Sequence, residues 1–178
     1  MPHKFVKEIE EIELKTFHFE DDGQIPNNPD LPLILYSAVL DLASNDLATV
    51  SETIFRANGW TGTWRNGIFS YHHFHSTAHE VLAIAGGQAN VHLGGERGIV
   101  VTVQAGDVVV IPAGVGHKNL GSSRDLLVIG AYPAGQSWDL CRGYSDERPQ
   151  VLHNISNVPL PEQDPVYGAV GPLLDCWS

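Results

Sequence analysis

The sequence predicts an all-β protein, either a sandwich or a barrel, on the strength of three observations. Its apolar segments are short, Gly and Pro separate them at close intervals, and several of them are rich in Val and Ile. The ranges expected to form strands are 33–40, 67–75, 80–85, 89–93, 99–103, 108–111 and 126–132. Pairs and triplets of Gly, Asp and Ser between these ranges supply the turns.

One segment has the period of a helix rather than of a strand. Its apolar residues recur at intervals of three and four, at Leu47, Val50, Ile54 and Ala57. Either a cap at 45–46 or a capping box of Thr49 and Glu52 would begin the helix, and the 58–59 Asn-Gly pair would end it. We expect one short helix on the outside of the β-structure.

The length of 178 residues fits one domain, expected to span 1–178. From about residue 133 the chain carries several prolines and little periodicity, but it keeps aromatic and leucine side chains. A disordered tail would lack these aromatics. We therefore expect the segment 133–178 to be an ordered extension that covers the barrel or a partner subunit.

The charge argues against polyanionic partners. The sequence has 10 Lys and Arg against 21 Asp and Glu, a formal charge of −11, and no basic cluster for nucleic acid or an anionic membrane surface. No apolar run reaches the ~18 residues of a membrane span, and the N-terminus does not read as a secretory signal. Two cysteines with neither disulfide-framework nor zinc-finger spacing favour a cytoplasmic, reducing location.

Five of the nine histidines fall between residues 72 and 92. In a strand over 67–75, His73 and His75 would point to one face, because side chains alternate. Glu80, at the start of the next strand, could bind the same ion and complete a facial set with open positions. His117 follows an apolar strand and a Pro/Gly turn and is expected to begin the next strand, so it could add a fourth ligand from the opposite sheet.

These residues resemble the two motifs of the cupins. The first, G-x5-H-x-H-x4-E-x6-G, runs from Gly67 to Gly87 with every spacing kept. The second, G-x5-P-x-G-x2-H-x3-N, runs over 106–121, although Gly121 replaces its final Asn and Asn119 lies two residues earlier. The resemblance implies a double-stranded β-helix with a metal near one mouth. It implies that the ligands are His73, His75, Glu80 and His117.

The flanking segments resemble a narrower group, the YjlB-like single-domain cupins of bacteria. Segments that carry this resemblance are Asp21-Asp22-Gly23, Asn58-Gly59-Trp60, Ser76-Thr77-Ala78-His79-Glu80, His117-Lys118-Asn119-Leu120-Gly121 and Pro159-Leu160-Pro161. They are spread over most of the chain. The resemblance brings no established reaction with it.

Several residues near the ligands are candidates for the pocket. Phe69 and Tyr71 share the expected ligand face, and Asn119 shares a face with His117. His79 stands at a junction of loop and strand, where alternation is unreliable, so it could enter the metal shell or its surroundings. His92 would line the site if the polar face of its strand looks inward. Tyr71 and His92 are the nearby candidates for a general base.

Two functions remain open at this point. The first is a metal-dependent enzyme acting on a small organic molecule through one divalent Fe, Mn, Ni or Zn ion, as an oxygenase, isomerase or decarboxylase. The alternative is a cupin that binds or senses a small ligand without turnover. The resemblance to cupins, together with the extension, also suggests a homodimer.

Overall fold

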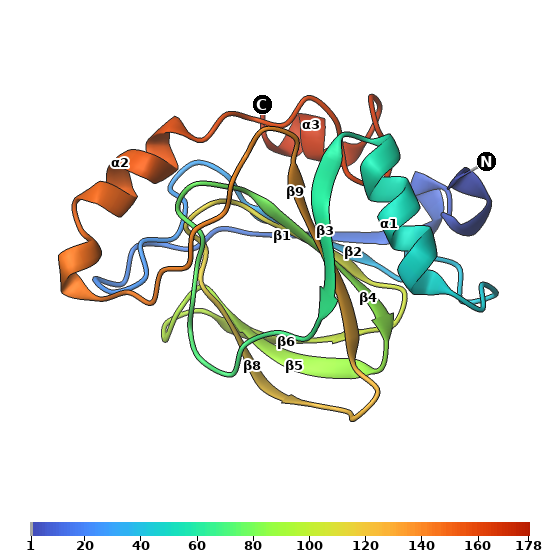
Figure 1. Cartoon of the computed structure of the whole chain (residues 1–178), viewed down its shortest axis with the longest axis horizontal. Helices are drawn as coiled ribbons and strands as arrows, with labels where there is room; N and C mark the ends of the chain where they lie inside the picture. The colour runs from blue at the N-terminus through green and yellow to red at the C-terminus, as the bar shows by residue number, and fades with distance from the viewer. Residues whose placement is uncertain (1) are drawn as a thin grey trace.

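A computed structural model describes residues 2–178, and its strands form two antiparallel sheets that face each other (Figure 1). The six-stranded sheet has the order β1 (Glu13–Phe17), β2 (Leu33–Ser37), β7 (Val108–Ile111), β4 (Glu80–Gly86), β9 (Leu127–Pro133) and β3 (Trp60–Asn66). The smaller sheet has the order β6 (Ile99–Gln104), β5 (Gln88–Leu93) and β8 (His117–Ser122). The expected all-β class is confirmed, and the fold is a double-stranded β-helix.

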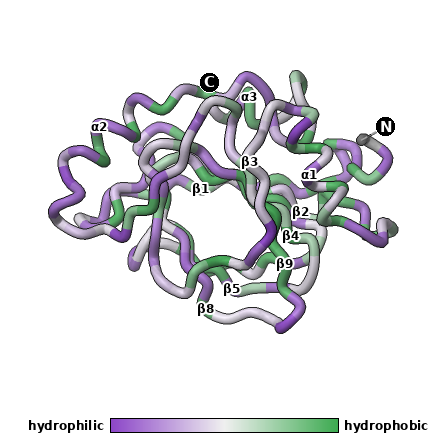
Figure 2. Tube along the Cα trace, viewed as in Figure 1, coloured by the Kyte–Doolittle hydropathy of each residue, from purple (hydrophilic) through white to green (hydrophobic). Residues whose placement is uncertain are grey.

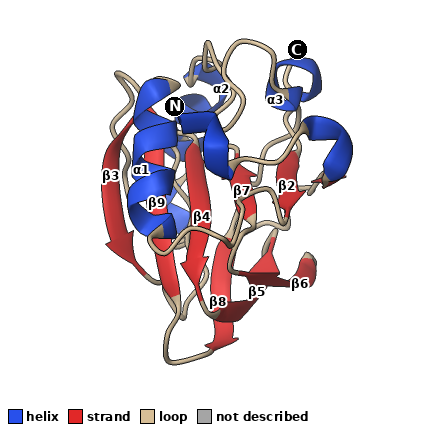
Figure 3. Ribbon diagram, turned by 90° about the vertical axis from the view of Figure 1, so that its right-hand side faces the viewer, coloured by secondary structure: helices blue, strands red, loops and turns tan. Residues whose placement is uncertain are grey.

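The helices lie outside the sheets. They are α1 (Leu47–Ala57), α2 (Gln150–Asn157) and α3 (Pro172–Cys176), with short 3₁₀ turns at Pro2–Phe5, Ile9–Glu11 and Ser145–Glu147. The helix α1 is the expected outer helix, and Figure 3 shows it lying across β9 and β4. Of the two expected starts, the structure has the cap at Asp46, whose carboxylate accepts a hydrogen bond from the Thr49 amide.

The extension beyond β9 is ordered and holds α2 and α3, two helices that the sequence did not predict. Both are short, and only two positions of α2 are buried, Val151 and Ile155. Asp164 ties the extension to the six-stranded sheet. Its carboxylate is fully buried and accepts a 2.5 Å hydrogen bond from the Tyr36 hydroxyl on β2.

Two apolar clusters hold these layers together. One fills the space between the sheets and includes Leu82, Val91 and Val109. The other lies on the far side of the six-stranded sheet, against α1 and the extension, and includes Val81 and Phe55. Because side chains alternate along β4, neighbouring residues of this strand enter opposite clusters. Figure 2 accordingly shows apolar stretches along both β4 and β9.

The expected strand over 67–75 is wrong. This segment forms only isolated bridges, His73 with His117 and Phe74 with Cys141. Its backbone changes partner from β8 to the C-terminal extension between two successive residues, so no continuous ladder can form. The alternation of side chains nevertheless survives, because Phe74 is fully buried on the side away from the neighbouring histidines.

Two strands escaped the sequence analysis, β1 and β3. The strand β1 is a mostly exposed edge strand, so it has no apolar face to signal it. A register shift between Thr61 and Trp64 interrupts β3, where Gly62 adopts a φ of 67°. This irregularity places Trp60 in the outer apolar cluster and Trp64 in the cluster between the sheets.

Candidate metal centre

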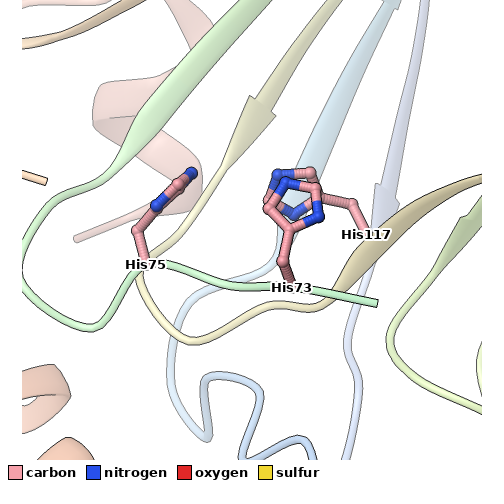
Figure 4. Close-up of side chains that lie close together, drawn as sticks. All are labelled: His73, His75 and His117. Atoms are coloured by element: carbon pink, nitrogen blue, oxygen red, sulfur yellow. The ribbon is translucent and has the colours of Figure 1, made fainter. Parts of the chain in front are cut away.

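Three buried histidines converge between the two sheets. His73 and His75 come from the segment that joins β3 to β4, and His117 is the first residue of β8. One ring nitrogen from each lies within 4.8 Å of the others (Figure 4). Metal–ligand bonds of about 2.0–2.2 Å separate two ligands of one ion by at most about 4.4 Å, so a small ring movement suffices for shared binding.

Glu80, the first residue of β4, adds a carboxylate to this group. Its Oε2 atom lies 3.2 Å from Nε2 of His75 and 3.2 Å from Nε2 of His117. The same oxygen is buried and makes no well-aligned hydrogen bond with any residue of the range 2–178. Donor atoms about 3.0–3.4 Å apart that point at a common centre, and not at each other, are the arrangement found around a bound ion.

Backbone carbonyls fix the orientation of all three imidazoles. Nδ1 of His73 lies 3.1 Å from the carbonyl oxygen of Tyr71, and Nδ1 of His117 lies 3.1 Å from that of Val115. Nδ1 of His75 contacts the carbonyl oxygen of Asp139, in the extension. A carbonyl can only accept, so Nδ1 carries a proton, and Nε2 of a neutral ring is left with its lone pair. Metal-binding histidines are commonly oriented in this way.

The charges of these side chains also favour the binding of a cation. Burial alone would raise the pKa of the Glu80 carboxyl, but the neighbouring imidazoles of His75 and His117 lower it well below its ordinary range. Burial, together with repulsion from His117, lowers the pKa of His73 to about 3. Burial acts downward on His75 too, but the charge of Glu80 raises its pKa overall. The site therefore holds an ionised carboxylate beside at least one neutral imidazole, which suits a divalent cation.

A cavity of about 280 Å³ opens onto these donors. Besides the four donors, its lining consists of Trp64, Arg65, Asn66, Gly67, Ile68, Phe69, Leu82, Tyr132 and Trp138. The wall is mainly apolar and aromatic. Trp138 stacks on Tyr132, with ring centroids 6.1 Å apart, and its edge meets the ring of His75 at 5.7 Å.

A hydrogen-bonded chain leads from this wall to the carboxylate. The indole nitrogen of Trp64 donates to the Tyr132 hydroxyl at 2.8 Å, and that hydroxyl lies 3.3 Å from Oε1 of Glu80. Burial raises the pKa of Tyr132 beyond its ordinary range, so its hydroxyl stays protonated and donates to the carboxylate. Sequence reasoning missed both aromatic residues as pocket residues. The alternation of β9 offered the only signal for Tyr132.

The structure places some of the other pocket candidates in the cavity lining and others away from it. Phe69 lines the cavity, as expected. Tyr71 does not. Its ring stacks on Phe69 at 5.0 Å and lies beneath the guanidinium group of Arg142, 3.7 Å from the ring centroid. Asn119 is also absent from the lining, because its side chain is bonded within its own strand, to Gly121 and Ser122.

His79 lies outside the group of donors. It is buried against Trp177, with ring centroids 4.7 Å apart, and its Nδ1 accepts a 2.9 Å hydrogen bond from the Ala113 amide. Burial lowers its pKa to about 4, so the ring is neutral at pH 7. Its position indicates that it packs the extension against the Pro/Gly turn that precedes His117.

His92 lies on the other side of its strand from the centre. On β5 the apolar Ala89, Val91 and Leu93 are buried, whereas Gln88 and Asn90 are exposed and His92 is half-buried. The polar face of β5 therefore looks outward. His92 contacts His72 there, with ring centroids 4.8 Å apart, and cannot reach the cavity as a general base.

Two antiparallel sheets with a histidine-rich site near one end define the class of this protein as a cupin. A cupin domain is matched over residues 64–126. The uncharacterized protein YjlB of Bacillus subtilis (strain 168) is 43% identical over 167 residues, which cover 94% of this chain and 98% of the relative. The chain belongs to the YjlB-like cupins.

Solved structures show likeness in fold alone. Acireductone dioxygenase from Bacillus anthracis, with cadmium in its active centre, is 15% identical over 71% of this chain and 82% of its own, with a TM-score of 0.41. A conserved protein of Klebsiella pneumoniae with a double-stranded β-helix domain is 13% identical over 79% of this chain and 94% of its own, with a TM-score of 0.35. Within residues 2–178, no helix is both long and apolar enough to cross a membrane.

Proposed function

We propose that this protein is an enzyme that uses one divalent transition-metal ion to act on a small organic molecule. The observation that carries the proposal is the set of three imidazoles whose Nδ1 atoms all face backbone carbonyls, leaving the Nε2 lone pairs beside an ionised Glu80. This set opens onto a cavity of about 280 Å³, large enough for a small substrate next to the ion.

His73, His75, Glu80 and His117 would hold the ion. A bound ion of this kind supplies Lewis acidity, or a site for dioxygen when it is Fe(II). Four protein ligands leave one or two positions of an octahedral ion open. Fe, Mn, Ni and Zn all accept imidazole and carboxylate, so the donor set favours no single one of them.

The residues around the donors would have different roles in substrate binding. Trp64, Phe69 and Trp138 offer flat apolar surfaces that would exclude water and hold an apolar or aromatic part of the substrate. Arg65 lies at the cavity with its guanidinium bound to Glu52, so it presents a partly neutralised charge to an incoming anion. Tyr132 would hold a proton at its hydroxyl, next to Glu80.

A metal-analysis and turnover experiment tests the proposal. Protein purified without air is analysed for metal and then screened for dioxygen consumption and product formation on pools of small molecules. We expect turnover that follows metal content and disappears in His73→Ala, while His153→Ala, which alters an exposed histidine on α2, keeps it. Turnover that persists in metal-free protein would reject the proposal.

A binding cupin without turnover is the second candidate. The observation that favours it is the placement of Tyr71 and His92 outside the cavity lining, which leaves Tyr132, among the described residues, as the one titratable lining side chain besides the four ligands and Arg65. Its hydroxyl is already engaged by Trp64 and Glu80. Thermal stabilisation by a pool compound, with no product formed at any metal content, would favour this candidate.

A further inference from the structure

The second cluster of histidines lies outside the cavity just described. His72 comes from the segment before β4, His92 from β5, and Glu96 from the turn between β5 and β6. One potential ligand atom from each lies within 4.8 Å of the others. His92 is 20 residues after His72, and Glu96 is four residues after His92. The fold, and not the local sequence, therefore brings His72 to the other two residues.

The cluster stands on the outer side of the strands that carry the first site. His72 directly precedes His73, and the backbone turns the two rings to opposite sides. Across the β5–β8 ladder, His92 pairs with Lys118 and Leu93 pairs with His117. The two groups of histidines therefore lie back to back on the same pieces of backbone.

The polar atoms of His72 lack partners. Both of its ring nitrogens are buried, and neither makes a well-aligned hydrogen bond with any other residue from 2 to 178. Nε2 lies 3.2 Å from Oε1 of Glu96, close enough for both atoms to bind one ion. Buried nitrogen atoms without partners cost free energy, and a cation bound between the two side chains would supply the missing interaction.

We propose that His72, His92 and Glu96 form a second site for a divalent transition-metal ion, separate from the cavity. Two imidazoles and one carboxylate with a water molecule as the fourth ligand are a set that Zn²⁺ accepts, and Co²⁺, Ni²⁺ and Cu²⁺ share the preference for imidazole. An ion there would link the segment that carries His73 and His75 to the β5–β6 turn.

The second site binds more weakly than the first. The side chain of Glu96 is 72% exposed, so binding must order it. Neither ring nitrogen of His72 has a carbonyl partner within residues 2–178 that would fix its tautomer. Lys118, the register partner of His92, adds a positive charge that opposes a cation. At the first site, by contrast, an ion would bind to donors that are already oriented and buried.

Equilibrium dialysis of the full chain, stripped of metal and titrated with Zn²⁺ near pH 7.5, tests the proposal. We expect two ions per chain in two affinity classes for the wild type. His92→Asn should lose the weaker ion and keep the tighter one, and Glu96→Gln should weaken the second class at least about tenfold. His117→Asn should impair the tighter class and keep the weaker one. The control His153→Asn, which changes an exposed histidine on α2, should bind as the wild type does.

A second measurement keeps the test independent of the variants' stability. In nuclear magnetic resonance spectra of wild-type protein, the imidazole signals of His72 and His92 should move only in the second step of the titration. A His92→Asn variant that binds as many Zn²⁺ ions as the wild type, and with the same affinities, overturns the proposal. The first site can fail or succeed without affecting this outcome.

Discussion

The hydroxyl of Tyr132 receives a hydrogen bond from the indole nitrogen of Trp64, 2.8 Å away, and stands 3.3 Å from Oε1 of Glu80. A carboxylate oriented in this way needs less rearrangement when it binds an ion. Partners of this kind commonly account for a 10–100-fold difference in metal affinity. We expect Tyr132→Phe to weaken Zn²⁺ binding at the tighter site by about tenfold, measured by competition with a chelator.

The matched control for this change is Tyr144→Phe, which removes a hydroxyl from an exposed ring. Its affinity should equal that of the wild type. Equal affinities in Tyr132→Phe and the wild type would show that the hydroxyl does not orient Glu80.

Trp64 lies so close to Gly130 that no side chain fits between them. A Cβ atom at Gly130 would stand 2.1 Å from Cε2 of the indole ring. Gly130→Ala should therefore displace Trp64 and lower the free energy of unfolding by about 1–3 kcal/mol. Denaturant unfolding measures the loss, and a shift of tryptophan fluorescence reports the displacement. Gly121→Ala, where a Cβ meets nothing within 4 Å, should change neither quantity.

Asp164 should be the residue on which the docking of the extension depends most. Its Oδ1 accepts hydrogen bonds from the amides of Val166 and Tyr167, and its Oδ2 accepts from the Leu173 amide and the Tyr36 hydroxyl. Asp164→Ala leaves these buried donors without a partner, which we expect to cost about 3–5 kcal/mol in denaturant unfolding. Asp175→Ala, at an exposed position of α3, should cost less than about 0.5 kcal/mol. Similar losses in both variants would contradict the anchoring role.

The same contact predicts how stability depends on alkaline pH. Burial, followed by the charge of Asp164, raises the pKa of Tyr36 well above its ordinary range. The fold therefore favours the neutral phenol. The stability that this provides is complete below the unfolded pKa of about 10 and is lost as pH rises from there through the folded value.

We expect the wild type to lose stability above about pH 10 more steeply than Tyr36→Phe, because the variant has no phenol to ionise at this position. Chemical unfolding at a series of pH values measures both slopes. The other tyrosines are common to both proteins, so the difference isolates Tyr36. Parallel slopes would refute the prediction.

The four donors were predictable from the sequence because they are few, close together and spaced as the cupin motifs are. Most residues of the cavity wall could not be predicted from the sequence. Trp64 faces the cavity because an irregularity at Gly62 reverses the alternation of β3, and no pattern of apolar residues announces such a shift. Trp138 and Asp139 come from a segment without periodicity, and only the folded chain brings them to His75.

The predicted strand over 67–75 is a second case in which the sequence did not reveal long-range contacts. Its residues alternate as those of a strand do, and the sequence correctly predicted that His73 and His75 share a face. It could not predict that the backbone passes from β8 to the extension between His73 and Phe74. Side-chain direction follows local geometry, whereas a strand also requires a neighbour that long-range folding supplies.

The contact between His75 and the carbonyl of Asp139 has a consequence for how the protein is made. During synthesis all four donor side chains leave the ribosome before Asp139 does. Until then the imidazole of His75 is free to carry its proton on either nitrogen, and the wall that Trp138 forms is missing. The nascent chain therefore holds all four donor side chains before it holds the finished site, and the candidate site is complete only after translation has passed residue 139.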